Sequence, residues 1–207
     1  MRVGGAVGAD RLCFPTKEEF SVGVTVRWTI RESESEDHEA ILGVVRMAFT
    51  DPDRDGQEEV DIVRDTWTLG AGIDGLELVA DVQGRVVGHV LAARGELGGE
   101  VVAAVAPLSV APSWQHRGVG SDLMGALLGR AEDQGWPLVV LLGDPGYYGR
   151  FGFETSWPLG IVYPPVGGGS PHFLARRMPT FRPSLRGEFR YCWEAHPPGL
   201  APGRRDR

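Results

Sequence analysis

Pro107-Leu-Ser-Val-Ala-Pro-Ser-Trp-Gln-His-Arg-Gly-Val-Gly120 is the stretch that decides the fold of this chain of 207 residues. It ends an apolar segment typical of a strand, residues 101–110, and a helical pattern follows it at once. Because Gly118 and Gly120 have no Cβ atom, backbone N–H groups of this turn can point at an anion. The positive end of the following helix adds to the attraction. The stretch predicts a cradle for a phosphorylated cofactor; an ordinary tight strand-to-helix turn is the alternative.

The turn differs from two common phosphate-binding motifs. It lacks the third glycine of the dinucleotide fingerprint, and it lacks the Gly-Lys-Ser/Thr of the P-loop. Residues 106–154 instead resemble the GNAT superfamily of acyl-CoA-dependent N-acetyltransferases. Gln115-His-Arg-Gly-Val-Gly120 fits the family's Gln/Arg-x-x-Gly-x-Gly/Ala pyrophosphate loop, and Tyr148-Gly-Arg-Phe-Gly-Phe153 fits its Tyr-x-x-x-Gly-Phe segment. The form of residues 142–154 resembles an uncharacterised branch of predicted N-acetyltransferases.

The resemblance implies an α/β (α+β) fold with a mixed, mostly antiparallel central sheet. Helices should cover both faces, and the sheet should be splayed at the cofactor site. We expect an N-acetyltransferase domain over residues 25–195, an N-terminal extension over 1–24 and a disordered tail over 196–207. Periodicity and turn residues predict helices at 36–49, 58–69, 118–134 and 147–151, strands at 26–30, 76–82, 85–93, 101–110, 138–142, 152–157, 173–177 and 188–194, and an exposed loop at 163–171.

The same resemblance implies acetyl-CoA as co-substrate. In the family, the pantetheine inserts beside the strand that precedes the cofactor loop. A backbone N–H there, which we assign to Leu108 or its neighbour, faces the thioester oxygen and stabilises the oxyanion. The residues expected to contact the cofactor are Leu108, Ser109, Val110, Gln115, His116, Arg117, Gly118, Val119, Gly120, Ser121 and Tyr148.

Tyr148 is the candidate general acid. It lies four residues before Gly152, where the family places such a tyrosine, and a protonated phenol can donate to a leaving thiolate. The alternative is an aromatic side chain that packs a short helix on the sheet. Tyr147 is the competitor, with a less suitable offset.

The group that removes a proton from the amine is not evident. Residues 101–110 contain no titratable side chain, and Glu100 stands too far from the thioester. Glu77 and Asp81 on one strand and His89 on the next are candidates, although each could be a solvated strand residue. A water chain, or an amine that arrives neutral, would serve equally.

Composition limits the remaining possibilities. The formal net charge of −7 argues against nucleic acid and is compatible with cationic substrates such as amines. No apolar run approaches the roughly 20 residues that span a bilayer. Cys13 and Cys192 belong to no CxxC or Cys/His cluster, and residues 51–56 do not fit a calcium loop, so we expect no metal. We expect a cytoplasmic protein, and a homodimer is possible.

The resulting prediction is an enzyme that transfers an acetyl group from acetyl-CoA to a primary amine of a small molecule or peptide by direct attack. Two alternatives stay open. One is a CoA-binding or regulatory module with the same fold and weak turnover, which the missing base would favour. The other is a non-enzymatic interaction domain, against which the intact cofactor loop argues.

Overall fold

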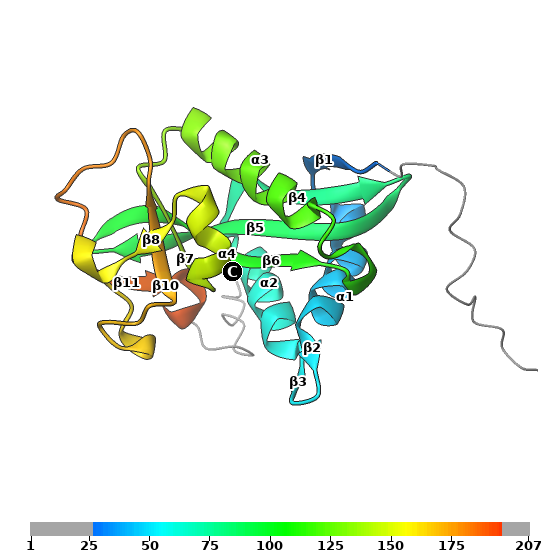
Figure 1. Ribbon diagram of the computed structural model, residues 1–207, viewed down its shortest axis with the longest axis horizontal. Coiled ribbons are helices and arrows are strands. Elements are labelled where there is room, and N and C mark those ends of the chain that lie inside the picture. The colour runs from blue at the N-terminus through cyan, green and yellow to red at the C-terminus, as the bar shows by residue number, and fades with distance from the viewer. Residues whose placement is uncertain (1–26, 196–207) are drawn as a thin grey trace, which may run out of the picture.

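A mixed sheet runs through the part of the chain that the computed structural model describes, residues 27–195 (Figure 1). Its main path follows the order β1-β4-β5-β6-β7-β10-β8, with antiparallel neighbours except for the parallel pair β6 and β7. The predicted mixed, mostly antiparallel sheet is therefore confirmed. The bounds are β1 Thr29–Glu32, β4 Gly72–Val82, β5 Arg85–Leu97, β6 Glu100–Val110, β7 Leu138–Leu142, β8 Glu154–Thr155, β9 Ile161–Val162, β10 Phe173–Arg177 and β11 Gly187–Tyr191.

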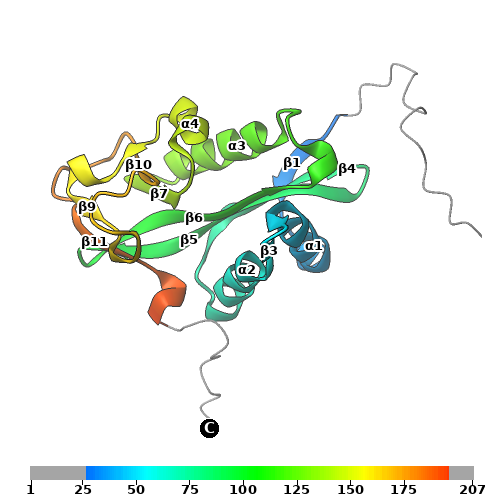
Figure 2. The same ribbon diagram turned by 60° about the horizontal axis from the view of Figure 1, so that its bottom comes forward.

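Helices cover both faces of the sheet, as predicted (Figure 2). Helices α1 (His38–Phe49) and α2 (Gln57–Leu69) lie on one face, and α3 (Val119–Asp133) and the short α4 (Pro145–Tyr148) lie on the other. The predicted extension 1–24 and tail 196–207, with Cys13 and Val26, lie outside the described residues.

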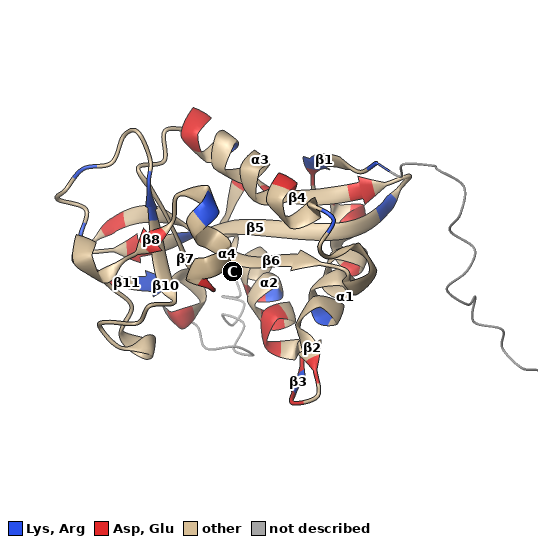
Figure 3. Ribbon diagram, in the orientation of Figure 1, with Lys and Arg blue, Asp and Glu red and all other residues tan. Residues whose placement is uncertain are grey.

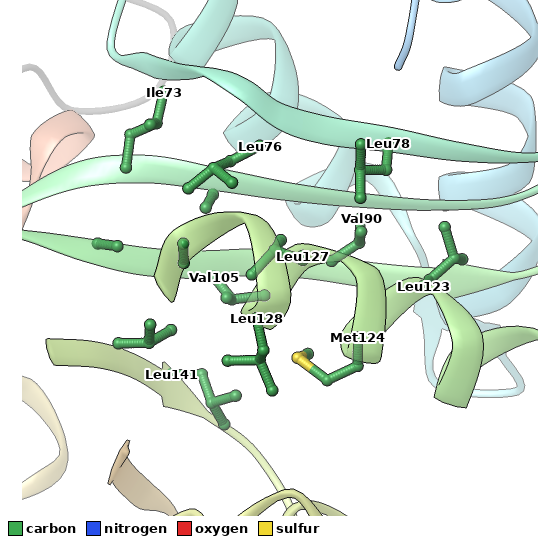
Figure 4. Close-up of a cluster of buried hydrophobic side chains, with 14 of the residues drawn as sticks. Ile73, Leu76, Leu78, Val90, Val105, Leu123, Met124, Leu127, Leu128 and Leu141 are labelled. Atoms are coloured by element: carbon green, nitrogen blue, oxygen red, sulfur yellow. The ribbon is translucent and has the colours of Figure 1, made fainter. Parts of the chain in front are cut away.

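The helix that follows the cofactor loop is fixed by its apolar stripe. Leu123, Met124, Leu127 and Leu128 of α3 are buried against Leu78, Val90 and other apolar side chains of β4 to β7 (Figure 4). Burying one such side chain contributes roughly 1.5–3 kcal/mol. The stripe therefore holds the N-terminal end of α3 at a fixed place beside the end of β6.

A second apolar layer joins α1 and α2 to the opposite face. Ile41, Val45, Val60 and Val63 are buried together with Leu91 of β5. The acidic start predicted for the first helix is present as a 3₁₀ turn, Ser35–Asp37, that leads into α1. The predicted loop between these helices forms a small hairpin, β2 (Thr50–Asp51) and β3 (Arg54–Asp55).

Two central strands are longer than predicted. β4 begins at Gly72 rather than Leu76, and β5 continues past Ala93 to Leu97. The added residues of β5 pair on both sides, with residues 100–103 of the adjacent β6 and, at 95–97, with the distant β11. The pairing with β11 leaves no local signal in the sequence.

The C-terminal third differs most from the prediction. The strand expected at 152–157 is reduced to Glu154–Thr155, because a 3₁₀ turn containing Pro158 begins at Trp157. The last strand ends at Tyr191, where a second 3₁₀ turn follows. Tyr163, expected in an exposed loop, is half-buried among other aromatic rings. Those rings are Phe173, Phe189 and Tyr191. The first strand spans Thr29–Glu32 rather than 26–30.

Candidate active site

The cofactor loop presents a free helix end. Gly118 has a φ of 99°, a left-handed conformation that favours glycine, and stands directly before α3. The N–H groups of Ser121 and Asp122 donate to the carbonyl oxygen of Gly118 over 2.9 and 3.0 Å. The amides of Val119 and Gly120 precede these bonds and belong to the first-turn donors that a helix leaves without an internal partner. The loop can therefore offer backbone donors to an anion.

Three side chains of the loop, those of Gln115, Arg117 and Val119, have different surroundings. The Gln115 amide donates to the carbonyl oxygen of Val110 over 3.1 Å, which ties the loop to the end of β6. The Arg117 guanidinium lies 5.3 Å from the centre of the partly buried Trp114 ring, while the Val119 side chain is fully buried. Val119 can contribute its backbone only, and Arg117 does not line the cavity described next.

A cavity of about 640 Å³ opens beside the loop. It brings together most of the residues predicted to contact the cofactor, whereas Ser109, Arg117 and Val119 are not in its wall. It also contains residues that the sequence did not reveal: Ala48 and Phe49 at the end of α1, Asp144, and Arg150. The complete lining is Ala48, Phe49, Leu108, Val110, Gln115, His116, Gly118, Gly120, Ser121, Asp144, Tyr147, Tyr148 and Arg150.

The sheet splays at this cavity, as predicted. β6 and β7 pair only from Ala103 with Val139 to Val105 with Leu141, although β6 continues to Val110. The N–H of Ala111 donates to Val87 of β5 over 2.9 Å. Because successive backbone groups of a strand alternate in direction, the amides of Leu108 and Val110 face away from β5, into the gap. This gap can accept an extended ligand as an additional strand.

Tyr148 stands on α4 at the rim of the gap. The Asp144 carboxylate caps that helix by accepting from the N–H of Gly146 at 3.0 Å. Gly143 leaves the space for the tyrosine, since a Cβ atom there would lie 2.3 Å from Cε2 of Tyr148. Burial raises the pKa of Tyr148, and Tyr147 adds to that effect. The phenol therefore keeps its proton at neutral pH.

Tyr147 also reaches the cavity, despite its less suitable offset. A Cβ atom on Gly120 would lie 2.7 Å from the Tyr147 hydroxyl, so this hydroxyl rests against the start of α3. The Arg150 guanidinium lies 4.1 Å from the centre of the Tyr147 ring and supplies a cation at the cavity. The sequence could have indicated Arg150 as a cavity residue, because Arg150 lies inside the Tyr148–Phe153 motif.

Glu77 and His89 are close to each other but not to Tyr148. Glu77 Oε1 lies 3.0 Å from Nε2 of His89, on the face covered by α1 and α2, and the Trp67 indole also donates to Glu77 over 3.0 Å. Neither residue lines the cofactor cavity. Burial alone would raise the pKa of Glu77, but the bonds from His89 and Trp67 outweigh it and hold the pKa below its ordinary value.

The other two carboxylates considered have structural partners. Asp81 binds Arg31 at 3.1 Å and accepts from the N–H of Gly84 in the β4–β5 turn at 2.8 Å. Glu100 pairs with Arg182 at the far end of β6. Among the candidate bases named from the sequence, Glu77 and His89 are thus the two that contact each other.

Comparison with known proteins agrees with this geometry. Residues 29–156, more than half of the chain, match the family model described as an acetyltransferase (GNAT) domain. The chain belongs to the GNAT acetyltransferase family. The resemblance noted in the sequence is thereby confirmed.

GNAT proteins of Escherichia coli are among its relatives. The uncharacterized N-acetyltransferase YjhQ of strain K12 is 34% identical over 101 residues, which make up 47% of this chain and 56% of that protein. YhbS of the same strain is 38% identical over 84 residues, 39% of this chain and 50% of that protein. The chain therefore spans about half the length of the curated relatives it matches.

Two solved GNAT structures cover most of the chain. YhbS from Escherichia coli, crystallised in complex with CoA, has a TM-score of 0.74 at 26% identity and covers 87% of this chain and 98% of its own. A GNAT family acetyltransferase from Brucella melitensis in complex with acetyl-CoA has a TM-score of 0.65 at 28% identity, covering 80% and 96%. Both support the GNAT fold seen here, including the C-terminal strands beyond residue 156.

The described part of this GNAT chain shows neither a membrane-spanning helix nor a metal-binding group. Within residues 27–195, every helix is too short or too polar to cross a bilayer. In the same range, His, Cys, Asp and Glu side chains form no group of three or more that could hold a metal ion.

Proposed function

We propose that the protein binds acetyl-CoA and transfers its acetyl group to a primary amine of a small molecule or peptide by direct attack. The observation that carries the proposal is the gap between β6 and β7, which opens directly beside the free N-terminal end of α3. A pyrophosphate fits the helix end, and an extended pantetheine fits the gap. The complexes of two similar GNAT proteins with CoA and acetyl-CoA support this assignment.

Polarisation of the thioester is assigned to the backbone of β6. The amide of Leu108 faces the gap and is positioned to donate to the thioester oxygen as negative charge develops there. Removal of one such donor costs about 2.7–4 kcal/mol in acyl transfer. The amide of Val110, two residues further, is available to the pantetheine.

Protonation of the leaving thiolate is assigned to Tyr148. Its raised pKa keeps the hydroxyl protonated, and its position in the cavity wall places it at the same gap as Leu108. As the amine nitrogen forms its bond to the carbonyl carbon, the C–S bond breaks and the thiolate takes the Tyr148 proton. The proton released by the attacking nitrogen restores the phenol.

The amine is expected to reach the gap from the side of α1. Ala48 and Phe49 at the end of α1 line the cavity, and the β2–β3 hairpin that follows is rich in carboxylates (Figure 3). Asp51, Asp53 and Glu58 belong to this region. The negative charge there attracts cations. For an amine that arrives as an ammonium ion, Glu77 and His89 are proposed as the groups that take its extra proton before the attack; the proton lost during the attack returns to Tyr148.

A CoA-binding module with weak turnover is the second candidate. It is favoured by one observation, that neither Glu77 nor His89 lines the cofactor cavity. Calorimetry with CoA and assays of CoA thiol release from acetyl-CoA with a panel of primary amines separate the two. Binding with amine-dependent release supports the enzyme, binding alone supports the module, and absence of binding contradicts both.

A further inference from the structure

A line of polar side chains crosses the sheet on the face opposite α3. Glu77, His89 and Ser109 stand on the neighbouring strands β4, β5 and β6. His89 is 0% exposed and Ser109 is 1% exposed. Glu77 retains 18% exposure at its side chain, toward a hollow of about 380 Å³ that includes His38 and Trp67. The line thus runs from a strand at the gap to a hollow that is open to the surface.

The junction between His89 and Ser109 is incomplete. The two residues are direct partners in the β5–β6 register, so their Cβ atoms lie about 4.5–5.5 Å apart on one face. Among the described residues, neither His89 Nδ1 nor Ser109 Oγ has a hydrogen-bond partner, and both atoms are buried. Buried polar atoms are rarely left unsatisfied. One bridging water, or rotation of the Ser109 hydroxyl about χ1, would join them.

The other end of the line fixes the tautomer of His89. Glu77 is ionised at neutral pH, and a carboxylate can only accept hydrogen bonds. The 3.0 Å contact therefore places the imidazole proton on Nε2. In this neutral tautomer Nδ1 carries no proton and is an acceptor, and it has no hydrogen-bond partner among the described residues.

Ser109 brings the line to the strand that borders the gap, although its own hydroxyl is buried and lies outside the cavity wall. It lies between Leu108 and Val110, whose amides face the gap and whose side chains pack on the α3 side. Because side chains alternate along a strand, Ser109 points to the opposite side, toward α1. The acceptor must approach from this side, since the cofactor occupies the other.

We propose that Ser109, His89 and Glu77 form a proton relay that deprotonates an acceptor arriving as an ammonium ion. This proposal rests on the proposed acetyl transfer. The ammonium N–H proton passes by way of a water molecule to the buried Ser109 Oγ as the hydroxyl proton moves to His89 Nδ1. The resulting imidazolium gives its Nε2 proton to Glu77, which releases it to water in the hollow. A shift of the remaining imidazole proton from Nδ1 to Nε2 restores the starting state.

The relay specifies the acceptor class. An alkylamine has a pKa near that of lysine, about 10.4, and is charged at neutral pH. It must lose this proton before its nitrogen can attack. An aryl amine is already neutral and needs no relay. The structure therefore assigns the site to alkylamine acceptors.

The test uses two acceptors of similar size, phenethylamine and para-ethylaniline, at neutral pH. With the alkylamine, Ser109→Ala and His89→Gln should each lower kcat by about 100-fold, within the usual range of acid–base catalysis. With the aryl amine, kcat should change less than about threefold, and the KM for acetyl-CoA should stay unchanged. Ser156→Ala is the matched control, because Ser156 is equally buried but bonds the carbonyl oxygen of Ile161 at 3.0 Å.

Equal losses with both acceptors would show a structural role and overturn the relay, as would wild-type kcat for Ser109→Ala with the alkylamine. A second measurement does not depend on turnover. Nitrogen NMR of the imidazole in the CoA-bound full chain should show the proton of His89 on Nε2. A proton on Nδ1 would overturn the relay. Failure of the wild type to bind CoA, or to acetylate either amine, would instead count against the proposed acetyl transfer.

Discussion

The two faces of the central sheet carry polar features that are built in different ways. On the α3 face, the cofactor site consists mainly of backbone: amides at the start of α3 and on β6, with glycines that leave them accessible. On the α1 face, Glu77, His89 and Ser109 form a line of side chains that depends on strand register. A backbone site tolerates many side-chain changes but fails when a Cβ atom is added at a critical position. A site built from side chains fails when one of those side chains is replaced, and it depends less on where glycines stand.

Gly120→Asp should have the largest effect and tests the backbone site. The new Cβ would lie 2.7 Å from the Tyr147 hydroxyl, and the carboxylate would repel a bound pyrophosphate. We expect CoA affinity to fall at least about a hundredfold, or ~2.7 kcal/mol, as measured by calorimetry. Gly125→Asp is the matched control on the same helix, because nothing lies within 4 Å of its Cβ position. Near wild-type CoA binding by a folded Gly120→Asp would remove the pyrophosphate assignment.

Tyr148→Phe should have the next largest effect and tests a side chain within the backbone site. Loss of the hydroxyl should lower kcat by roughly 10- to 1000-fold, while the ring keeps acetyl-CoA affinity nearly unchanged. Because the pKa of Tyr148 is raised, wild-type kcat should show no loss from its ionisation between neutral pH and about pH 10. Steady-state kinetics over this range provides the measurement.

Tyr147→Phe is the comparison for that experiment. Its hydroxyl rests against Gly120, so its loss should raise the KM for acetyl-CoA rather than lower kcat. If Tyr148→Phe keeps its kcat while Tyr147→Phe loses it, the general-acid role passes to Tyr147.

The same contrast explains what the sequence could predict. The cofactor loop was predictable because Gly118 and Gly120 are fixed by local geometry and lie five residues or fewer from the other loop residues. Helix α3 and strand β7 followed from their apolar spacing, and β7 has the predicted bounds. Tyr148 was found because its motif is contiguous.

The polar line on the α1 face was only partly predictable. Glu77 and His89 could be named as candidates, but their contact depends on the pairing of β4 with β5. Ser109 was predicted to contact the cofactor, and the alternation along β6 instead turns its side chain to the other face. The predicted bounds of β8 and β11 were wrong for another reason, because 3₁₀ turns at Trp157–Leu159 and at Cys192–Ala195 follow these strands where the sequence had suggested that they continue.

Glu77→Gln should affect stability moderately and tests the side-chain site. The folded state lowers the pKa of Glu77, so its stabilising effect is present above the unfolded value of about 4.3 and is lost as pH falls through the folded pKa. Loss of about 1.5 kcal/mol from charged hydrogen bonds should lower Tm by about 3–6 °C at pH 7. The difference from wild type should shrink below about pH 4.

Thermal melts at both pH values provide the measurement, and Glu132→Gln is the control. Glu132 is exposed on α3 and should leave Tm unchanged. A Tm difference for Glu77→Gln that persists undiminished at low pH would show that packing, rather than the charge of Glu77, stabilises this face.

The smallest effect is expected from removing residues that neither face uses. Both polar features lie within residues 27–195, so a chain of residues 25–195 should fold and bind CoA like the full chain. Phe14, Phe20, Val22 and Val24 are the risk, because burial of one such side chain contributes roughly 1.5–3 kcal/mol. At this chain length, about 1 kcal/mol moves Tm by roughly 2–4 °C. Melts of the two chains decide the question: a drop of more than about 10 °C would mean that residues 1–24 support the sheet on which both sites depend.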